Sequence, residues 1–270
     1  MADTLLDDVG GLLRETADQV VLPLFRKLDA ADISEKAPGD LVTVADRRAE
    51  EIISVALRRL RPGSVVVGEE AVADDPTLLE HLRGSGDVWL VDPVDGTSNF
   101  AAGRQPFALM VALLTDGDPV AAWVLDPLAG TLAVARAGEG TRLDGRPVRT
   151  GDRAPALDAV RGAAMSHALP AAPRALVEAG GARLGELLPG LHCAGREYLD
   201  VLTGDQDFVL FWSTLPWDHA PGSLLVRAAG GVARRFDGTD YRPGDDGHGL
   251  LVAASEHVWA EVREALLGGA

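Results

Sequence analysis

The stretch that decides the fold is Val88-Trp89-Leu90-Val91-Asp92-Pro93-Val94-Asp95-Gly96-Thr97. Its four apolar residues predict a buried strand, and the acids stand where that strand ends, a position that often faces a binding crevice. Pro93 restricts the backbone, and Gly96 permits an unusual turn. A tight turn here lets the carboxylates of Asp92 and Asp95 converge. Two carboxylates that close repel each other unless a cation lies between them, so we expect a cation site at this point.

Short apolar runs surround this stretch in the first half of the chain. They predict strands over 64–68, 87–91, 107–115, 120–125 and 131–137. Compact turns such as Asp116-Gly117-Asp118-Pro119 separate them, which favours an antiparallel sheet. Before the sheet, apolar residues at helical spacing predict a long helix over 5–25 and a second helix over about 46–60. The break at Pro38-Gly39 and a short extended stretch over 41–44 lie between these two helices.

The second half of the chain has a different pattern. Strands are expected over 207–212 and 249–254, each followed by a helix, over 218–229 and 255–267. We therefore predict an α+β domain over 1–148 that carries the cation site, with a mainly antiparallel sheet. A smaller α/β domain over 149–270 completes the site.

Composition excludes several classes of function. The net charge is −16, from 25 basic and 41 acidic residues, and such a surface repels nucleic acid and anionic membranes. No apolar run approaches the roughly 18 residues of a membrane span, and the acidic N-terminus does not resemble a signal peptide. Cys193 is the single cysteine, which fits a reducing compartment. We expect a soluble, cytoplasmic protein that binds neither nucleic acid polymers nor membranes.

Three further acids stand at the ends of predicted elements. Glu69 follows the strand at 65–67, Asp46 begins the second helix, and Asp218 begins the helix at 218–229. Each has a simpler alternative, because Asp46 and Asp218 fit helix N-caps, and Asp92 with Asp95 fits a capped turn. Together the acids form an oxygen-only ligand set, which indicates Mg²⁺ or Mn²⁺ rather than zinc. Glu70 is interpreted as a solvated neighbour of Glu69.

Four segments, in this order, resemble the motifs of the inositol monophosphatase family of Mg²⁺-dependent, lithium-sensitive phosphatases. They are Asp40-Leu41-Val42-Thr43-Val44-Ala45-Asp46, Val67-Gly68-Glu69-Glu70, the segment from Trp89 to Phe100, and Trp217-Asp218-His219-Ala220-Pro221-Gly222 with Ala229-Gly230-Gly231. The match spans nearly the whole chain. The resemblance implies a layered α-β-α-β-α sandwich and a homodimer.

The resemblance also implies roles for individual residues. Glu69, Asp92 and the carbonyl of Val94 would hold a first Mg²⁺, and Asp92, Asp95 and Asp218 a second, with Glu69 reaching a weaker third ion. Thr97, with Asp46 behind it, would orient and help deprotonate the attacking water together with Glu69. The amides of Gly96 and Thr97 would bind phosphate oxygens. Lys36 would lie in a mobile loop over the site.

The chemistry of these residues favours direct attack by water. Thr97 is a poor nucleophile with no histidine beside it in sequence. Two cations neutralise a phosphate dianion, and one of them lowers the pKa of a bound water. The three-residue spacing of Asp92 and Asp95 differs from the two-residue spacing of haloacid dehalogenase phosphatases, and the chain has no P-loop motif.

The choice of substrate stays open at the sequence level. Gly195-Arg196-Glu197 resembles the family stretch that lines the leaving-group pocket, and Arg196 either binds a second anionic group or is a surface residue. Phe211 stands where inositol phosphatases have a glutamate that binds sugar hydroxyls, so inositol phosphate itself is in doubt. Ser166 and His167 are candidates to approach the pocket, and His219 is expected to point away from the metal acids.

These observations predict a Mg²⁺-dependent phosphomonoesterase with two or three ions, Mn²⁺ being possible. Its substrate would be a small phosphorylated metabolite: an inositol-phosphate-like, sugar, amino-alcohol or nucleotide phosphate. The alternatives are a 3′(2′),5′-bisphosphate nucleotide or fructose 1,6-bisphosphate phosphatase. A non-catalytic regulatory protein on the same scaffold is the alternative from another class.

Overall fold

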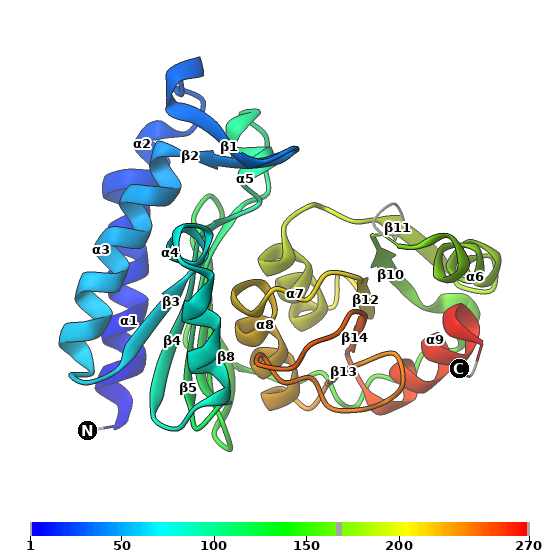
Figure 1. Cartoon of the computed structure of the whole chain (residues 1–270). Helices are drawn as coiled ribbons and strands as arrows, with labels where there is room; N and C mark the ends of the chain where they lie inside the picture. The colour runs from blue at the N-terminus through cyan, green and yellow to red at the C-terminus, as the bar shows by residue number, and fades with distance from the viewer. Residues whose placement is uncertain (1, 166–168, 269–270) are drawn as a thin grey trace.

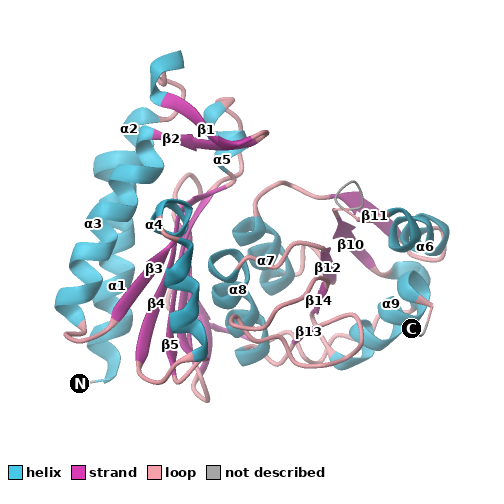
Figure 2. Ribbon diagram, in the orientation of Figure 1, coloured by secondary structure: helices cyan, strands magenta, loops and turns pink. Residues whose placement is uncertain are grey.

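The chain folds into five alternating layers of helices and sheets. A computed structural model describes residues 2–165 and 169–268. Two helices cover one face of a seven-stranded sheet, and two more helices cover its other face (Figures 1 and 2). A five-stranded sheet packs on this second pair of helices, and two outer helices cover its far side. The predicted α-β-α-β-α sandwich is confirmed.

The first layer consists of the N-terminal helices. The long helix predicted over 5–25 is present in three consecutive parts: α1 (Ala2–Thr16), a π-helical turn (Ala17–Val21) and α2 (Leu22–Leu24). Helix α3 (Val44–Leu60), with Thr43 as its N-cap, begins two residues earlier than predicted. Leu13 and Ile53, on the inner faces of α1 and α3, pack in one apolar core with Trp89 and Trp123 of the sheet.

The second layer is the seven-stranded sheet, whose order follows the sequence from β3 to β9. Its strands are β3 (Val65–Gly68), β4 (Asp87–Asp95), β5 (Ala108–Thr115), β6 (Asp118–Asp126), β7 (Thr131–Arg136), β8 (Gly140–Leu143) and β9 (Arg146–Val148). Five of its six pairings are antiparallel, as predicted. The exception is β3 with β4, which run parallel because α4 (Glu69–Asp74) and a 3₁₀ helix (Pro76–Arg83) form the crossover between them.

The third layer contains α7 (Ala194–Thr203) and α8 (Pro216–Ala228), buried between the two sheets (Figure 1). Their apolar side chains share a core with Met110 and Val124 on one side and with Val209 and Val252 on the other. Helices of the second half of the chain therefore cover a sheet of the first half.

The last two layers complete the sandwich. The five-stranded sheet has the order β11-β10-β12-β14-β13. Its strands are β10 (Arg161–Ala164), β11 (Glu186–Pro189), β12 (Phe208–Phe211), β13 (Val232–Arg234) and β14 (Leu250–Ala253), and it is preceded by a 3₁₀ turn (Leu157–Ala159). The outer helices are α6 (Ala171–Gly181) and α9 (Glu256–Leu267), whose buried residues face the side of this sheet opposite to α7 and α8.

A small hairpin lies at one end of the first sheet, beside α5 (Thr97–Ala101) in Figures 1 and 2. It pairs β1 (Ile33–Ala37) with β2 (Asp40–Thr43) through a turn at Pro38 and Gly39, after a 3₁₀ turn (Ala30–Asp32). The sequence predicted β2 as an extended stretch but left β1 as a loop.

The first sheet ends at Val148 and the second begins at Arg161. A division into 1–148 and 149–270 remains a prediction, because α7 and α8 contribute to the core of both halves. Among the described helices, none has the length and apolar content needed to cross a membrane.

Close packing of α7 against α8 depends on Gly222. A Cβ atom at this position would lie 2.0 Å from the buried ring of Tyr198. We expect Gly222→Ala to lower the free energy of unfolding by roughly 1–3 kcal/mol or more, because a closely packed core cannot accommodate the methyl group. Urea denaturation measures this change.

Gly11 of α1 is the matched control. It is exposed, and a Cβ there would meet no atom within 4 Å. We expect Gly11→Ala to raise the free energy of unfolding by up to about 1 kcal/mol, since alanine is the better helix former. Similar effects of the two substitutions would contradict the packing argument.

Candidate active site

The acids Asp92 and Asp95 lie in a β-bulge rather than in a turn. Strand β4 continues to Asp95, with Asp92 opposite Met110 and Asp95 opposite Ala108. Two residues, Pro93 and Val94, therefore face a single residue of β5. Proline suits a bulge because it has no amide hydrogen to donate to the ladder. The tight turn expected to bring Asp92 and Asp95 together is wrong, whereas the unusual turn expected at Gly96 is confirmed, with φ +88°.

The other predicted acids occupy first turns of helices. Glu69 is the first residue of α4, Asp46 lies in the first turn of α3, and Asp218 lies in that of α8. The alternative of Asp218 as an N-cap is not realised, because Leu215 is the N-cap of α8. These first turns surround the bulge, and a helix N-terminus favours a nearby negative charge.

Burial and mutual repulsion act on these carboxylates together. Asp92 is 2% exposed, and burial, followed by the charges of Glu69, Asp95 and Asp218, raises its pKa well above the usual value. Burial and the charges of Asp95 and Glu69 also raise the pKa of Asp218, while a hydrogen bond with Asp92 lowers it. Carboxylates gathered this closely repel one another unless they are protonated or a cation lies between them.

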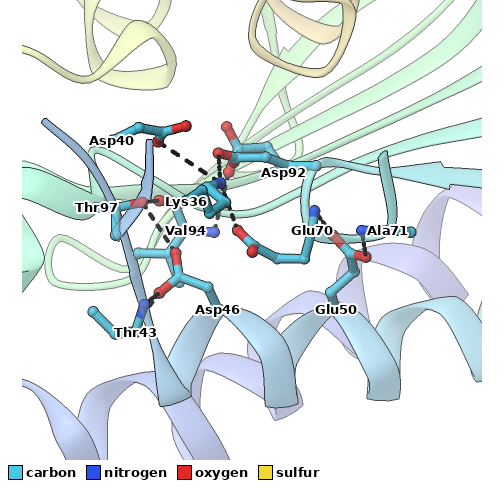
Figure 3. Close-up of polar contacts among 11 residues, drawn as sticks. Lys36, Asp40, Thr43, Asp46, Glu50, Glu70, Ala71, Asp92, Val94 and Thr97 are labelled. Carbon is cyan, nitrogen blue, oxygen red and sulfur yellow. Dashed lines mark hydrogen bonds and ion pairs between the residues drawn. The ribbon is translucent and has the colours of Figure 1, made fainter. Parts of the chain in front are cut away.

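Lys36 places a positive charge among the acids (Figure 3). Its Nζ donates to Glu69 Oε1 at 2.6 Å and to Glu70 Oε1 at 3.0 Å. Burial opposes the ammonium charge, but Glu69 and Glu70 outweigh burial and raise the pKa of Lys36. The predicted loop position of Lys36 is wrong, because the residue lies in strand β1, at an irregularity in its pairing with β2. Glu70 is buried rather than solvated, and its Oε2 has no hydrogen-bond partner among the described residues.

Asp46 connects the helix start of α3 to Thr97 (Figure 3). One carboxylate oxygen accepts from the amide and the hydroxyl of Thr43, which completes a capping box. The other accepts from Thr97 Oγ1 at 3.0 Å. Burial raises the pKa of Asp46 to about 6, against the opposing effect of the Thr43 hydrogen bonds. The alternative of Asp46 as the N-cap is therefore wrong, because Thr43 is the N-cap. Asp46 is the third helical residue of the capping box and accepts a hydrogen bond from Thr97.

Asp95 also binds the start of α7, which the sequence did not predict. Its carboxylate accepts from the amides of Ala194 (3.1 Å) and Gly195 (2.6 Å) and from Cys193 Sγ (3.1 Å). A Cβ at Gly96 would lie 3.2 Å from the Cβ of Cys193, so glycine allows this close approach. In the sequence, the small residues at the start of α7 were the one feature that could have indicated this close contact with Asp95.

Glu50 is a second residue that the sequence did not single out. It lies one turn after Asp46 on α3 and is buried. Its Oε2 accepts from the amide of Glu70 at 2.8 Å and its Oε1 from the amide of Ala71 at 2.9 Å (Figure 3). Glu50 thus fixes the helix start that carries Glu69. The four-residue spacing from Asp46 would have indicated a shared helix face.

A cavity of ≈ 280 Å³ opens beside these acids. The predicted site residues on its wall are Asp95, Gly96, Thr97 and Asp218. The remainder of the wall includes Asp40, Leu41, Met165, His192, Cys193, Phe211, Trp212 and His219. Phe211 therefore lies where it can contact a leaving group.

Arg196 is not among the residues that line this cavity. Its guanidinium pairs with Asp200 at 2.7 Å and with Asp126 at 3.3 Å. This geometry gives no support to Arg196 as a substrate ligand. The ring of His219 hydrogen-bonds with Tyr198 and with the backbone of Ser213. Ser166 and His167 lie outside the described residues.

The donor set fits a hard cation. Within the described part of the chain, no three His, Cys, Asp or Glu side chains already form a metal-coordination shell. The available donors are nevertheless carboxylate oxygens, whose pKa values are raised by burial and by one another. Glu70 Oε2 adds a buried acceptor with no partner among the described residues. Mg²⁺ and Mn²⁺ prefer such oxygen ligands.

Comparison with known proteins agrees with the motif resemblance. The model of the inositol monophosphatase family matches residues 6–267. The chain belongs to the inositol monophosphatase family. An inositol-1-monophosphatase of Rhizobium meliloti is 34% identical over 248 residues, which cover 90% of this chain and 88% of that protein. The chain is thus a phosphatase of the inositol monophosphatase family.

Two further relatives show the range of this family. The Nus factor SuhB of Pseudomonas aeruginosa is 31% identical over 83% of each chain. The fold resembles that of the IMPase of Thermotoga maritima with a TM-score of 0.79, at 23% identity over 99% of this chain and 100% of that one. The family predicted from the four motifs is therefore confirmed.

The role of Glu50 is tested by Glu50→Gln. A Gln side chain offers one oxygen, so one of the two amides it serves would face an NH₂ group. We expect the free energy of unfolding to fall by about 1–3 kcal/mol, the cost of a buried donor left without its partner. Glu51→Gln, at the exposed neighbour on α3, is the control and should stay within about 0.5 kcal/mol of the wild type. Equal free energies of unfolding for the two variants would contradict the role of Glu50 in anchoring the start of α4.

Proposed function

We propose that the protein is a Mg²⁺-dependent phosphomonoesterase in which a water molecule attacks the phosphorus of a small phosphate ester. The observation that supports this best is the gathering of Glu69, Asp92, Asp95 and Asp218 beside the hydrogen-bonded pair Thr97–Asp46. Acids gathered this closely around the buried Asp92 and Asp95 need cations, and the pair provides a place to orient a nucleophile. A phosphate dianion is the kind of ligand that an acidic pocket binds only with cations present.

The residues that would hold the cations follow from the family resemblance. Glu69, Asp92 and the carbonyl of Val94 would hold one, and Asp92, Asp95 and Asp218 a second, with a third nearer Glu69. When bound, these ions neutralise phosphate charge and lower the pKa of a coordinated water. Asp92 lies at the centre of the set, because every other acid contributes to its raised pKa.

Thr97 orients the nucleophile through the single hydrogen of its hydroxyl. Oγ1 lies 3.0 Å from Asp46 Oδ1 and 3.0 Å from the carbonyl oxygen of Val94, so its hydrogen is donated to one of these acceptors. The lone pairs of Oγ1 are then directed to accept a hydrogen bond from water. As the water gives up a proton to Thr97, Asp46 receives the hydroxyl hydrogen. The pKa of Asp46, about 6, suits a group that exchanges protons near neutral pH.

The substrate side of the cavity favours a small monoester. Asp95 and Asp218 lie on its wall, and the amides of Gly96 and Thr97 stay candidates for binding phosphate oxygens. Phe211 cannot accept the hydrogen bonds that a polyol offers. Because Arg196 is paired with Asp126 and Asp200, the alternatives with a second phosphate, a bisphosphate nucleotide or fructose 1,6-bisphosphate, are less favoured.

Some relatives carry the name Nus factor, which states no enzymatic activity, so the non-catalytic alternative is considered for this chain. This chain keeps every acid and the threonine that the reaction needs, which supports the enzyme. A homodimer, a cytoplasmic location and the roles of the individual ligands remain predictions.

Cation binding is tested by stability without any substrate. Asp92→Asn removes one charge from the repelling set but can keep the acceptor for the Val94 amide. In EDTA we expect the variant to melt at a higher temperature than the wild type. Adding Mg²⁺ should raise the melting temperature of the wild type, since a ligand that binds only the folded state stabilises it, and should raise that of the variant much less. An identical Mg²⁺ response in both proteins would count against Asp92 as a ligand.

Activity is tested by phosphate release from a panel of sugar, polyol, amino-alcohol and nucleotide monophosphates. We expect release to require Mg²⁺, to stop in excess EDTA, and to fall at least about a hundredfold in Asp218→Asn, because a lost carboxylate weakens the cation that neutralises the phosphate. Asp74→Asn, an exposed acid at the end of α4, should stay within about twofold of the wild type. Undiminished phosphate release in excess EDTA would contradict the proposed metal dependence.

A further inference from the structure

His192 has an unusual backbone conformation at the wall of the cavity. Its φ is +56°, in the left-handed region that favours glycine. Few residues other than glycine adopt this region, and such conformations persist where surrounding contacts enforce them, often at functional sites. The side chain is exposed, and His192 lines the same cavity as Asp95 and Thr97. The reaction described above does not use it.

The fold holds the backbone around His192 from two directions. The amide of Leu191 donates to Glu197 Oε1 at 2.7 Å, and the carbonyl of Leu191 accepts from Asn99 Nδ2 at 2.9 Å. A Cβ on Gly96 would lie 3.2 Å from the carbonyl oxygen of His192, so the phosphate-side turn is packed directly against it. These contacts fix the backbone at His192 next to the turn at Gly96, whose amide is a candidate phosphate ligand.

Other apolar and aromatic side chains line the same cavity. Phe211 stacks on Tyr198 with ring centroids 5.6 Å apart, and Trp212 stacks on His248 at 5.1 Å with a 14° angle between the rings. Trp212 is partly exposed, and Met165 is the next wall residue of this kind. Phe211 and Trp212 are therefore each held by a ring contact within the protein.

We infer that the leaving group of the substrate is an alcohol that carries a planar ring, and that His192 and Trp212 bind this ring. The inference rests on the proposed phosphomonoesterase function and specifies its substrate class. Ring faces gain from stacking with imidazole and indole, whereas a polyol would leave its hydroxyl groups without acceptors along Phe211, Trp212 and Met165. His192 is then a residue that determines specificity.

Two phosphate esters of primary alcohols provide the test, because both carry the same reacting phosphate group. They differ in the alcohol, which carries a planar ring in one ester and hydroxyl groups in the other. For the wild-type protein with Mg²⁺ we expect kcat/KM for 2-phenylethyl phosphate to exceed that for glycerol 1-phosphate by about tenfold or more. His192→Gly should raise KM for the phenylethyl ester roughly three- to tenfold, the value of one ring contact, and leave glycerol phosphate within about twofold. His192→Asn, which tolerates the left-handed backbone but lacks the ring, should behave in the same way.

The glycine variant also separates recognition from structure. Glycine relieves the left-handed conformation, so the melting temperature of His192→Gly should equal or exceed that of the wild type. A stable variant that loses the ring preference supports the inference. If both esters release phosphate at similar kcat/KM, or if His192→Gly affects both equally, the inference is overturned while the proposed function stands. No phosphate release from either ester or from the wider panel would overturn both.

Discussion

Repulsion among carboxylates in a poorly hydrated place is the constraint on which the rest of this structure depends. Asp92 is almost completely buried, and its pKa is raised by burial and then by the charges of Glu69, Asp95, Asp218 and Asp46. The fold tolerates this because three of the acids lie in first turns of helices, whose amide ends favour negative charge. These helix starts lie near Asp92, because the charges of Asp46, Glu69 and Asp218 all act on it. The proposed cation site would therefore be a consequence of how the layers meet.

The backbone near the acids is held by side-chain carboxylates rather than by packing alone. Glu50 binds two amides at the start of α4, Asp46 binds the start of α3, and Asp95 binds the start of α7. A carboxylate that accepts from backbone amides fixes position more strictly than an apolar contact, because hydrogen bonds are directional. Helix α3 supplies two of these three anchors, so its orientation on the sheet controls the geometry of the acids.

The sequence predicted the fold class and the set of acids because both leave local signals. Strong apolar periodicity identified the strands and helices, and each acid stands at the end of an element. The bulge at Asp92–Asp95 and the parallel pairing of β3 with β4 could not be predicted in this way. Both depend on which strands become neighbours in the sheet, and the sequence of one strand does not determine its neighbours. Lys36 and Glu70 were misjudged for the same reason, because their partners lie about 33 residues apart in sequence. Glu50 was also missed, but here the sequence did hold a local signal, because Glu50 lies one helical turn after Asp46.

The hydrogen bonds of Asp95 join the two halves of the chain within the acid cluster. This acid ends the last strand segment before Gly96, and its carboxylate caps a helix that begins about a hundred residues later. A substitution at Asp95 would therefore remove hydrogen-bond acceptors from the start of α7 as well as a negative charge from the acid cluster. The junction between the two halves of the chain and the proposed cation site thus share one carboxylate.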